Sequence, residues 1–255
     1  MEILGIVIVV VITAAIIVGA TIFQAKRQSK NPKIKEIKSK LNPTISGKEK
    51  SRIFKYYTKF FDGNVSIMQE TSVQEGDQHV DLVHFSASEK FPFQVLATIG
   101  ASSYKMPHMV NNMAMWNEYV MFFDKDFNLN DERNGWAIQF LAFTAKFAYR
   151  SQTTLTYYHT LETQDDEGEE KPEEDEMLKH TNMRAVYLMS PKILNDFGVK
   201  IGAFKNIFFL QAMPITGQEL AKAKEMSEKD EMDFLEKEFY NFEKDPTGFL
   251  VKAER

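Results

Sequence analysis

The residue types that most often carry out chemistry are few in this chain of 255 residues, and their spacing matches no common catalytic motif. Cysteine is absent, which excludes disulfides, thiol catalysis and zinc–thiolate sites. The phosphate-binding loop, the dinucleotide-binding glycine pattern, the zinc-protease helix motif and the serine-hydrolase elbow are all missing. The five histidines never reach tight metal-ligand spacing: His79, His84, His108, His159 and His180. The sequence therefore predicts neither a metal site nor a bound cofactor.

Polar side chains near the ends of predicted strands remain as candidates for function. One interpretation is a hydrolase-like enzyme that uses His84, His159 and nearby acids. The alternative for His159 is a structural hydrogen bond where a helix meets a strand, because buried polar groups normally find partners. For a partner-binding surface, the sequence points to Asp81, His84, Tyr104 and His159, each of which can instead serve only to form the fold.

Hydrophobic periodicity predicts the elements that must position these side chains. Lys48–Asp62 has apolar side chains at helical spacing and predicts an amphipathic helix. After Asp131, aromatic side chains recur at helical spacing, which predicts a long capped helix over 132–150 with a buried aromatic stripe. A capping-box pattern at Thr216 and a second start at Ser227 predict C-terminal helices. Short alternating or apolar runs predict strands at 65–69, 80–85, 93–99, 119–123, 155–161, 184–188 and 207–213, with a short helix at 191–197.

The N-terminal segment Ile3–Phe23 predicts a transmembrane helix. It contains no charged residue, Pro, Asn or Gln, and its length as a helix matches a hydrocarbon core of roughly 30 Å. A cleaved signal peptide fits less well, since no basic residue precedes the run and the run exceeds the usual apolar length. Between Lys26 and Lys55 there are eleven basic and two acidic residues. The positive-inside rule therefore places the N-terminus outside the cell membrane and the main domain in the cytoplasm, as a single-pass protein.

Charge and composition divide the rest of the chain into a tether and one domain. We expect an anchor at 1–24, a basic tether at 25–47 and a domain at 48–255 with an acidic loop at 163–177. The net charge of the whole chain is −5 although the tether is strongly basic, so the domain is acidic. An acidic domain argues against nucleic acid as a partner, whereas the tether favours anionic lipid.

Four patches of sequence, in order along the chain, carry a family resemblance. They are Asp81–Phe85 with Phe91–Ser102, Met106–Pro107 with Glu118–Phe123, Trp136 with Tyr158–Leu161, and Phe209–Thr216 with Glu219–Leu220. Together they resemble the suppressor-of-fused domain in its bacterial single-domain form, over roughly residues 48–240. Tyr158 stands where that family usually has Gly, the acidic loop is longer than usual, and the N-terminal anchor is not a standard family feature.

The resemblance implies an α+β fold in which a mixed, mainly antiparallel sheet packs with helices. It also implies a domain that binds other proteins rather than catalysing a reaction. The animal member of the family sequesters a transcription factor through strand addition, and bacterial members look like immunity proteins that neutralise toxins. We therefore expect a membrane-tethered, non-enzymatic protein-binding module of immunity or sequestering type, whose partner is another protein such as a toxin. The alternatives are the hydrolase-like enzyme and a scaffold that reads membrane lipid.

Overall fold

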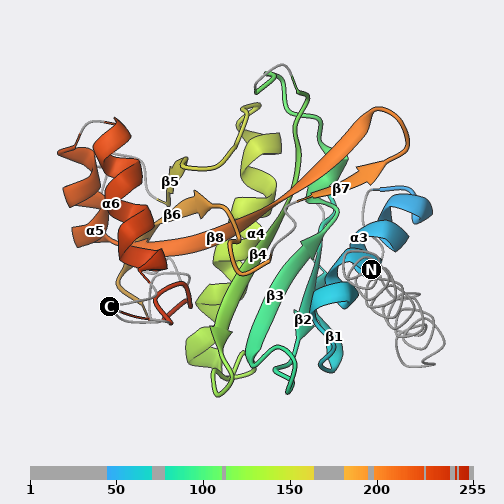
Figure 1. The fold of residues 1–255 in the computed structure, drawn as a ribbon, viewed down its shortest axis with the longest axis horizontal. Coiled ribbons are helices and arrows are strands. Elements are labelled where there is room, and N and C mark those ends of the chain that lie inside the picture. Colours follow the sequence, from blue (N-terminus) through green and yellow to red (C-terminus); the bar gives the residue numbers. More distant parts are fainter. Residues whose placement is uncertain are drawn as a thin grey trace, which may run out of the picture. The chain divides into compact units, whose positions relative to one another are not determined.

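A mixed sheet of eight strands organises the part of the chain that the structure describes (Figure 1). The computed structural model describes residues 45–70, 78–110, 113–163, 181–194, 198–226, 228–241, 245 and 247–252. All of them belong to one compact unit, Asn42–Arg255. The strands are β1 (Val65–Glu70), β2 (Asp81–Phe85), β3 (Phe93–Ile99), β4 (Trp116–Asp124), β5 (Thr160–Glu162), β6 (Met183–Met189), β7 (Gly198–Ile201) and β8 (Lys205–Thr216).

The strand order is β1-β2-β3-β4-β8-β6-β5, and β7 also pairs with β8. Strands β4 and β8 run parallel, while the other strand pairs are antiparallel. This arrangement confirms the predicted α+β class with a mainly antiparallel sheet. The central strands are buried on both faces, as their near-continuous apolar sequences require.

Helices α3 (Gly47–Phe60) and α4 (Gly135–Arg150) cover opposite faces of this sheet. Successive strand residues point to opposite faces. Phe122 of β4 meets Phe61 at the end of α3, whereas Phe123 stacks on Phe127, which contacts Trp136 of α4. Each face is therefore sealed by aromatic side chains, and α3 and α4 contribute to two separate layers of the core.

Two of the caps predicted from sequence are formed, at Thr216 and Asp131, and the second lies on a different element, while Ser227 falls outside the described residues. Thr216 and Glu219 form the expected capping box of α5 (Gly217–Lys224), and α6 (Glu228–Tyr240) buries Leu235 and Phe239. Asp131, however, caps a short 3₁₀ turn, η2 (Glu132–Asn134), and α4 begins only at Gly135. In the aromatic stripe of α4, the first two rings are buried and the last two half-buried: Trp136, Phe140, Phe143 and Phe147.

A buried carboxylate ties β3 to β4. Glu118 accepts hydrogen bonds from the Thr98 hydroxyl at 2.6 Å, the Gly100 amide at 2.9 Å, and both the hydroxyl and the amide of Ser102 at 2.6 and 3.2 Å. Thr98 in turn accepts from the amide of Tyr119 at 2.8 Å. Burial raises the pKa of Glu118, and these hydrogen bonds oppose the rise. Glu118 belongs to the second of the four sequence patches, and Thr98, Gly100 and Ser102 belong to the first. The two patches therefore meet at this junction.

Two sequence predictions need correction in the described residues. The strand predicted at 155–161 is confined to Thr160–Glu162, because Tyr158 has φ +74°, which an extended strand does not allow. The short helix predicted at 191–197 is not formed at 191–194, which are turns, and β7 follows where the sequence predicts no strand.

Other predictions fall outside the described residues. These include the transmembrane helix at Ile3–Phe23, the tether up to residue 44, and the acidic loop from residue 164 onward. Within the ranges that the structure does describe, no helix combines the length and apolar character needed to cross a membrane.

Candidate functional site

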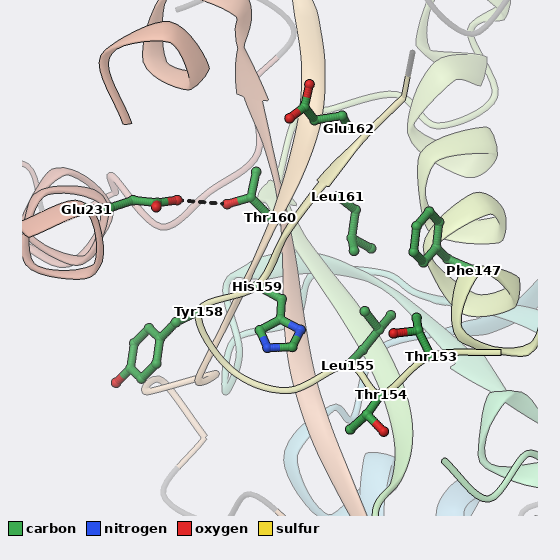
Figure 2. Close-up of a pocket in the computed structure, with 10 residues that line it drawn as sticks. All are labelled: Phe147, Thr153, Thr154, Leu155, Tyr158, His159, Thr160, Leu161, Glu162 and Glu231. Carbon is green, nitrogen blue, oxygen red and sulfur yellow. Dashed lines mark hydrogen bonds between the residues drawn. The ribbon is translucent and has the colours of Figure 1, made fainter. Parts of the chain in front are cut away.

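An open hollow of about 640 Å³ lies between the end of α4 and strand β5 (Figure 2). Its volume falls in the range of sites that hold small molecules or a few side chains of a partner. It mixes apolar, hydroxyl and acidic groups, from Phe147, Thr153, Thr154, Leu155, Tyr158, His159, Thr160, Leu161, Glu162 and Glu231. These residues come from α4, the loop at 151–159, β5 and α6, so the site depends on the tertiary fold.

The turn at Tyr158 and His159 is fastened to β6 by backbone hydrogen bonds. The Tyr158 amide donates to the Leu188 carbonyl at 2.6 Å, and the Leu188 amide donates to the His159 carbonyl at 2.8 Å. Tyr158 has φ +74°, a left-handed backbone conformation that glycine adopts without strain and other residues rarely adopt. A tight turn is therefore formed at Tyr158, and it directs the Tyr158 ring away from that of His159 (Figure 2).

The polar side chains around the hollow make defined contacts with their neighbours. The Thr160 hydroxyl donates to Glu231 of α6 at 3.1 Å, and Glu162 pairs with Lys224 of α5 at 2.8 Å. The Thr154 hydroxyl accepts from the His108 amide at 2.9 Å. These groups supply hydrogen-bond donors and acceptors at known places. The Thr154 and Thr160 hydroxyls also hold the loop and α6 in place. This arrangement suits the recognition of a binding partner.

Two phenols next to residues of the hollow, Tyr157 and Tyr187, remain neutral at physiological pH. Burial raises the pKa of Tyr157 to about 12, and the neighbouring Tyr158 adds to the rise. Burial likewise raises the pKa of Tyr187, which pairs with Thr160 in the sheet and whose ring packs against Phe239 of α6. The Tyr187 hydroxyl is buried and has no hydrogen-bond partner among the described residues. Both phenols can therefore donate a hydrogen bond but carry no charge.

Strand β5 is the last of the described strands on this side of the sheet. Among the described strands it pairs only with β6, through Thr160, Leu161 and Glu162. A strand with one unoccupied edge offers backbone donors and acceptors to a partner segment. The hollow lies against this short strand, so backbone and side-chain contacts are available at the same place.

The structure brings only one of the four predicted contact residues to this hollow. His159 is exposed and lines it. Asp81 is fully buried on β2, with the His79 ring 3.1 Å away. His84 lies 2.7 Å from Gln94, and burial lowers its pKa. Tyr104 packs edge-on against Tyr149 of α4, with ring centroids 5.7 Å apart.

His84 and His159 do not share an active site. His84 lies on β2 and His159 immediately precedes β5, and four strands separate β2 from β5 in the sheet. At about 4.8 Å per strand spacing, the two strands are about 24 Å apart. No group of three or more His, Asp or Glu side chains in the described ranges could hold a metal ion.

Sequence patterns did not indicate several residues of the hollow. Phe147 belongs to the aromatic stripe predicted as core, and its half-buried position marks the end of that stripe. Glu231 and Thr160 are 71 residues apart in the chain, and only the packing of α6 against β5 brings them together. Nothing in their local sequence distinguishes them from solvated polar residues.

Comparisons with known proteins match both the sequence and the fold. The family model described as suppressor of fused protein (SUFU) matches residues 76–245. A SUFU homolog from Neisseria gonorrhoeae FA 1090 superposes with a TM-score of 0.52 at 13% identity, covering 80% of this chain and 93% of that chain. The Sufu–Fu complex structure superposes with a TM-score of 0.48 at 8% identity, covering 80% of this chain and 87% of that chain. Drosophila Suppressor of Fused superposes with a TM-score of 0.39 at 10% identity, covering 63% of this chain and 38% of that chain. No curated protein matches the chain.

Proposed function

This chain belongs to the suppressor of fused family, and we propose that it is a membrane-tethered, non-enzymatic module that binds another protein. The observation that carries the proposal is the family match over about two-thirds of the chain. Suppressor of fused homologues bind protein partners, and the Sufu–Fu complex is an example.

We further propose that the partner occupies the hollow beside β5. The edge of β5 to which no described strand pairs suits an added segment, and His159 and Tyr158 lie where side chains of such a segment would reach. The acids Glu162 and Glu231 favour a partner segment with basic or hydrogen-bond-donating side chains. An immunity or sequestering role accounts for a binding module without a catalytic constellation, and a toxin is then the partner.

Site-directed photo-crosslinking in the native membrane tests this site. A photoreactive residue replaces the exposed His159 in the full chain, and a matched version replaces the exposed Asp126 in the turn that follows β4. We expect one dominant protein adduct from position 159 and none from position 126, identified by mass spectrometry. Equal capture at both positions, or no protein adduct at either, would contradict binding at the hollow.

The tethering part of the proposal rests on the sequence of Ile3–Phe23 and the basic residues after it. It predicts that the chain stays with membranes during alkaline carbonate extraction. It also predicts that protease added outside intact spheroplasts leaves the domain uncut, whereas permeabilised cells lose it. Cleavage of the domain in intact spheroplasts would reverse the proposed orientation.

A further inference from the structure

The outer face of α3 carries a continuous stripe of positive charge. Lys48, Arg52, Lys55 and Lys59 are all exposed, and their spacing of four, three and four residues places them on one side of the helix. The opposite side of α3 buries Ile53, Phe54, Tyr56 and Tyr57 in the core. The direction in which the stripe faces is therefore set by the packing of the helix.

The β7–β8 hairpin places an apolar tip beside this stripe. Ile201 pairs with Lys205, so Gly202, Ala203 and Phe204 form the loop between the strands. All three loop residues are exposed, and Phe204 reaches 92% exposure, the highest of the large apolar side chains in the described residues. Gly202 has φ +65°, a conformation that suits glycine and keeps the loop tight.

Two polar contacts join the hairpin to α3. The Arg52 guanidinium donates to the Lys200 carbonyl of β7 at 2.5 Å. Lys205 of β8 pairs with Glu49 of α3 at 2.5 Å and also donates to the Ser102 carbonyl at 2.7 Å. The hairpin and the stripe thus form one surface, and Figure 1 shows β7 next to α3.

The charge of this surface is opposite to that of the protein as a whole. The two segments Gly47–Phe60 and Gly198–Lys205 hold seven basic residues and one acid, Glu49, in a chain of net charge −5. Glu49 is neutralised by Lys205. Asp62 is the first acid after the helix in the sequence, and it accepts a hydrogen bond from the Ser88 hydroxyl at 2.5 Å. Lys90 donates to the Lys59 carbonyl at 3.2 Å.

Helix α3 is the first described helix that follows the predicted anchor in the sequence. Only 23 residues separate Phe23, the last residue of the predicted span, from Gly47, the first residue of α3. Fully extended, that segment reaches at most about 80 Å. The basic stripe thus follows the predicted tether directly in the sequence.

We propose that the α3 stripe and the β7–β8 tip dock the domain on an anionic lipid bilayer, with Phe204 inserted at the headgroup level. Basic side chains next to an apolar tip are the combination that binds anionic interfaces, since lipid phosphates attract the cations and the acyl boundary accepts the ring. The inference rests on the proposed tethering, and it adds a defined orientation of the domain. The hollow beside β5 belongs to a different part of the sheet and stays free for a protein partner.

The natural absence of cysteine makes a direct test possible. Phe204→Cys in the full chain is labelled with an environment-sensitive fluorophore and reconstituted in vesicles of phosphatidylcholine, with or without phosphatidylglycerol. Gln218→Cys on α5, also exposed, is the matched control. We expect a blue shift and quenching by lipid-attached quenchers for position 204 in anionic vesicles only, and an aqueous signal for position 218 in both.

Charge reversal separates docking from tethering. Lys48→Glu with Lys55→Glu should abolish the blue shift at position 204, whereas Lys229→Glu with Lys237→Glu on α6 makes the same charge change and should preserve it. An aqueous signal at position 204 in anionic vesicles, an equal shift in neutral vesicles, or a shift retained after reversal of the stripe would overturn the docking surface. Carbonate extraction of the same vesicles measures anchoring independently of docking. A chain that resists extraction but keeps an aqueous signal from the label at position 204 would contradict the docking surface and leave the proposed anchor intact.

Discussion

Tyr158 holds a backbone conformation that a residue with a Cβ atom disfavours, at the turn where the loop from α4 reaches the sheet. Its φ of +74° lies in the left-handed region, where non-glycine residues lose about 1 kcal/mol or more. We expect Tyr158→Gly to be more stable than Tyr158→Ala by about 1 kcal/mol, because both lose the ring and only alanine keeps the strain. Urea unfolding of the two variants measures the difference. Equal stability would mean that the turn relaxes when the ring is removed.

Glu118 gives a pH dependence whose sign follows from its burial. Burial raises its pKa in the folded chain above the unfolded value, so its contribution to stability is complete below the unfolded pKa and is lost as pH rises through the folded pKa. Glu118→Gln should therefore remove part of the decline in the free energy of unfolding over that range. Glu118→Ala should cost about 3 kcal/mol or more at any pH, since it leaves the Gly100 and Ser102 amides buried without an acceptor.

Chemical denaturation at a series of pH values, compared between variants, tests both statements. Glu132→Gln on the exposed η2 turn makes the same chemical change without burial and is the control. A Glu118→Gln profile parallel to that of the original protein would show that Glu118 does not set the pH dependence.

At the scale of elements, the contact between α3 and the β7–β8 hairpin is a separable unit. Arg52→Met keeps most of the aliphatic stem but removes the donor to the Lys200 carbonyl, so β7 should open more often. We expect faster amide hydrogen exchange in β7, with a loss of about 1 kcal/mol or less in overall stability. Lys55→Met, on the same stripe, should leave exchange in β7 unchanged. Faster exchange across the whole sheet would show that the contact is not local.

Some helices and strands could be predicted from the sequence and others could not. The helix at 48–62 was predictable because its apolar residues recur at helical spacing, and the strand at 93–99 because it is a short, mostly apolar run that is buried from Val95 onward. Strand β7 was not, since its four residues include Gly198 and Lys200 and gain their place by pairing with β8. The sequence could not show that the strand predicted at 155–161 begins only at Thr160, because Tyr158 has a strand-forming side chain but occupies a left-handed turn.

The candidate site was less predictable than the fold, for a related reason. His159 was found because it combines a titratable ring with a strand end. Glu231 is a polar residue on a polar helix, and its contact with Thr160 depends on how α6 docks. Asp81 and His84 lie on the same predicted strand, yet Asp81 is fully buried and His84 is only partly buried. Such differences depend on neighbours far apart in the chain.

For the whole molecule, the elements that precede the family match are as important to the core as those within it. The match begins at residue 76, yet α3 and β1 precede it. Tyr57 of α3 is fully buried and donates to the Thr98 carbonyl at 2.9 Å. Phe61 packs its ring against Phe85 and Phe122, with centroids 5.3 and 6.3 Å away. Without these residues, this face of the sheet would lose the aromatic cover that Tyr57 and Phe61 provide.

Truncation should therefore have opposite effects at two nearby boundaries. A chain of residues 42–255 should unfold cooperatively, with a midpoint close to that of the full chain in detergent, because the compact unit begins at Asn42. A chain of residues 76–255 should not fold cooperatively, since it exposes the apolar face that α3 covers. In the full chain, Phe61→Ala should cost about 3–5 kcal/mol, as expected for a buried ring. Cooperative unfolding of 76–255 would show that α3 is an accessory to the family domain, and the α3 surface would then have to be explained by docking alone.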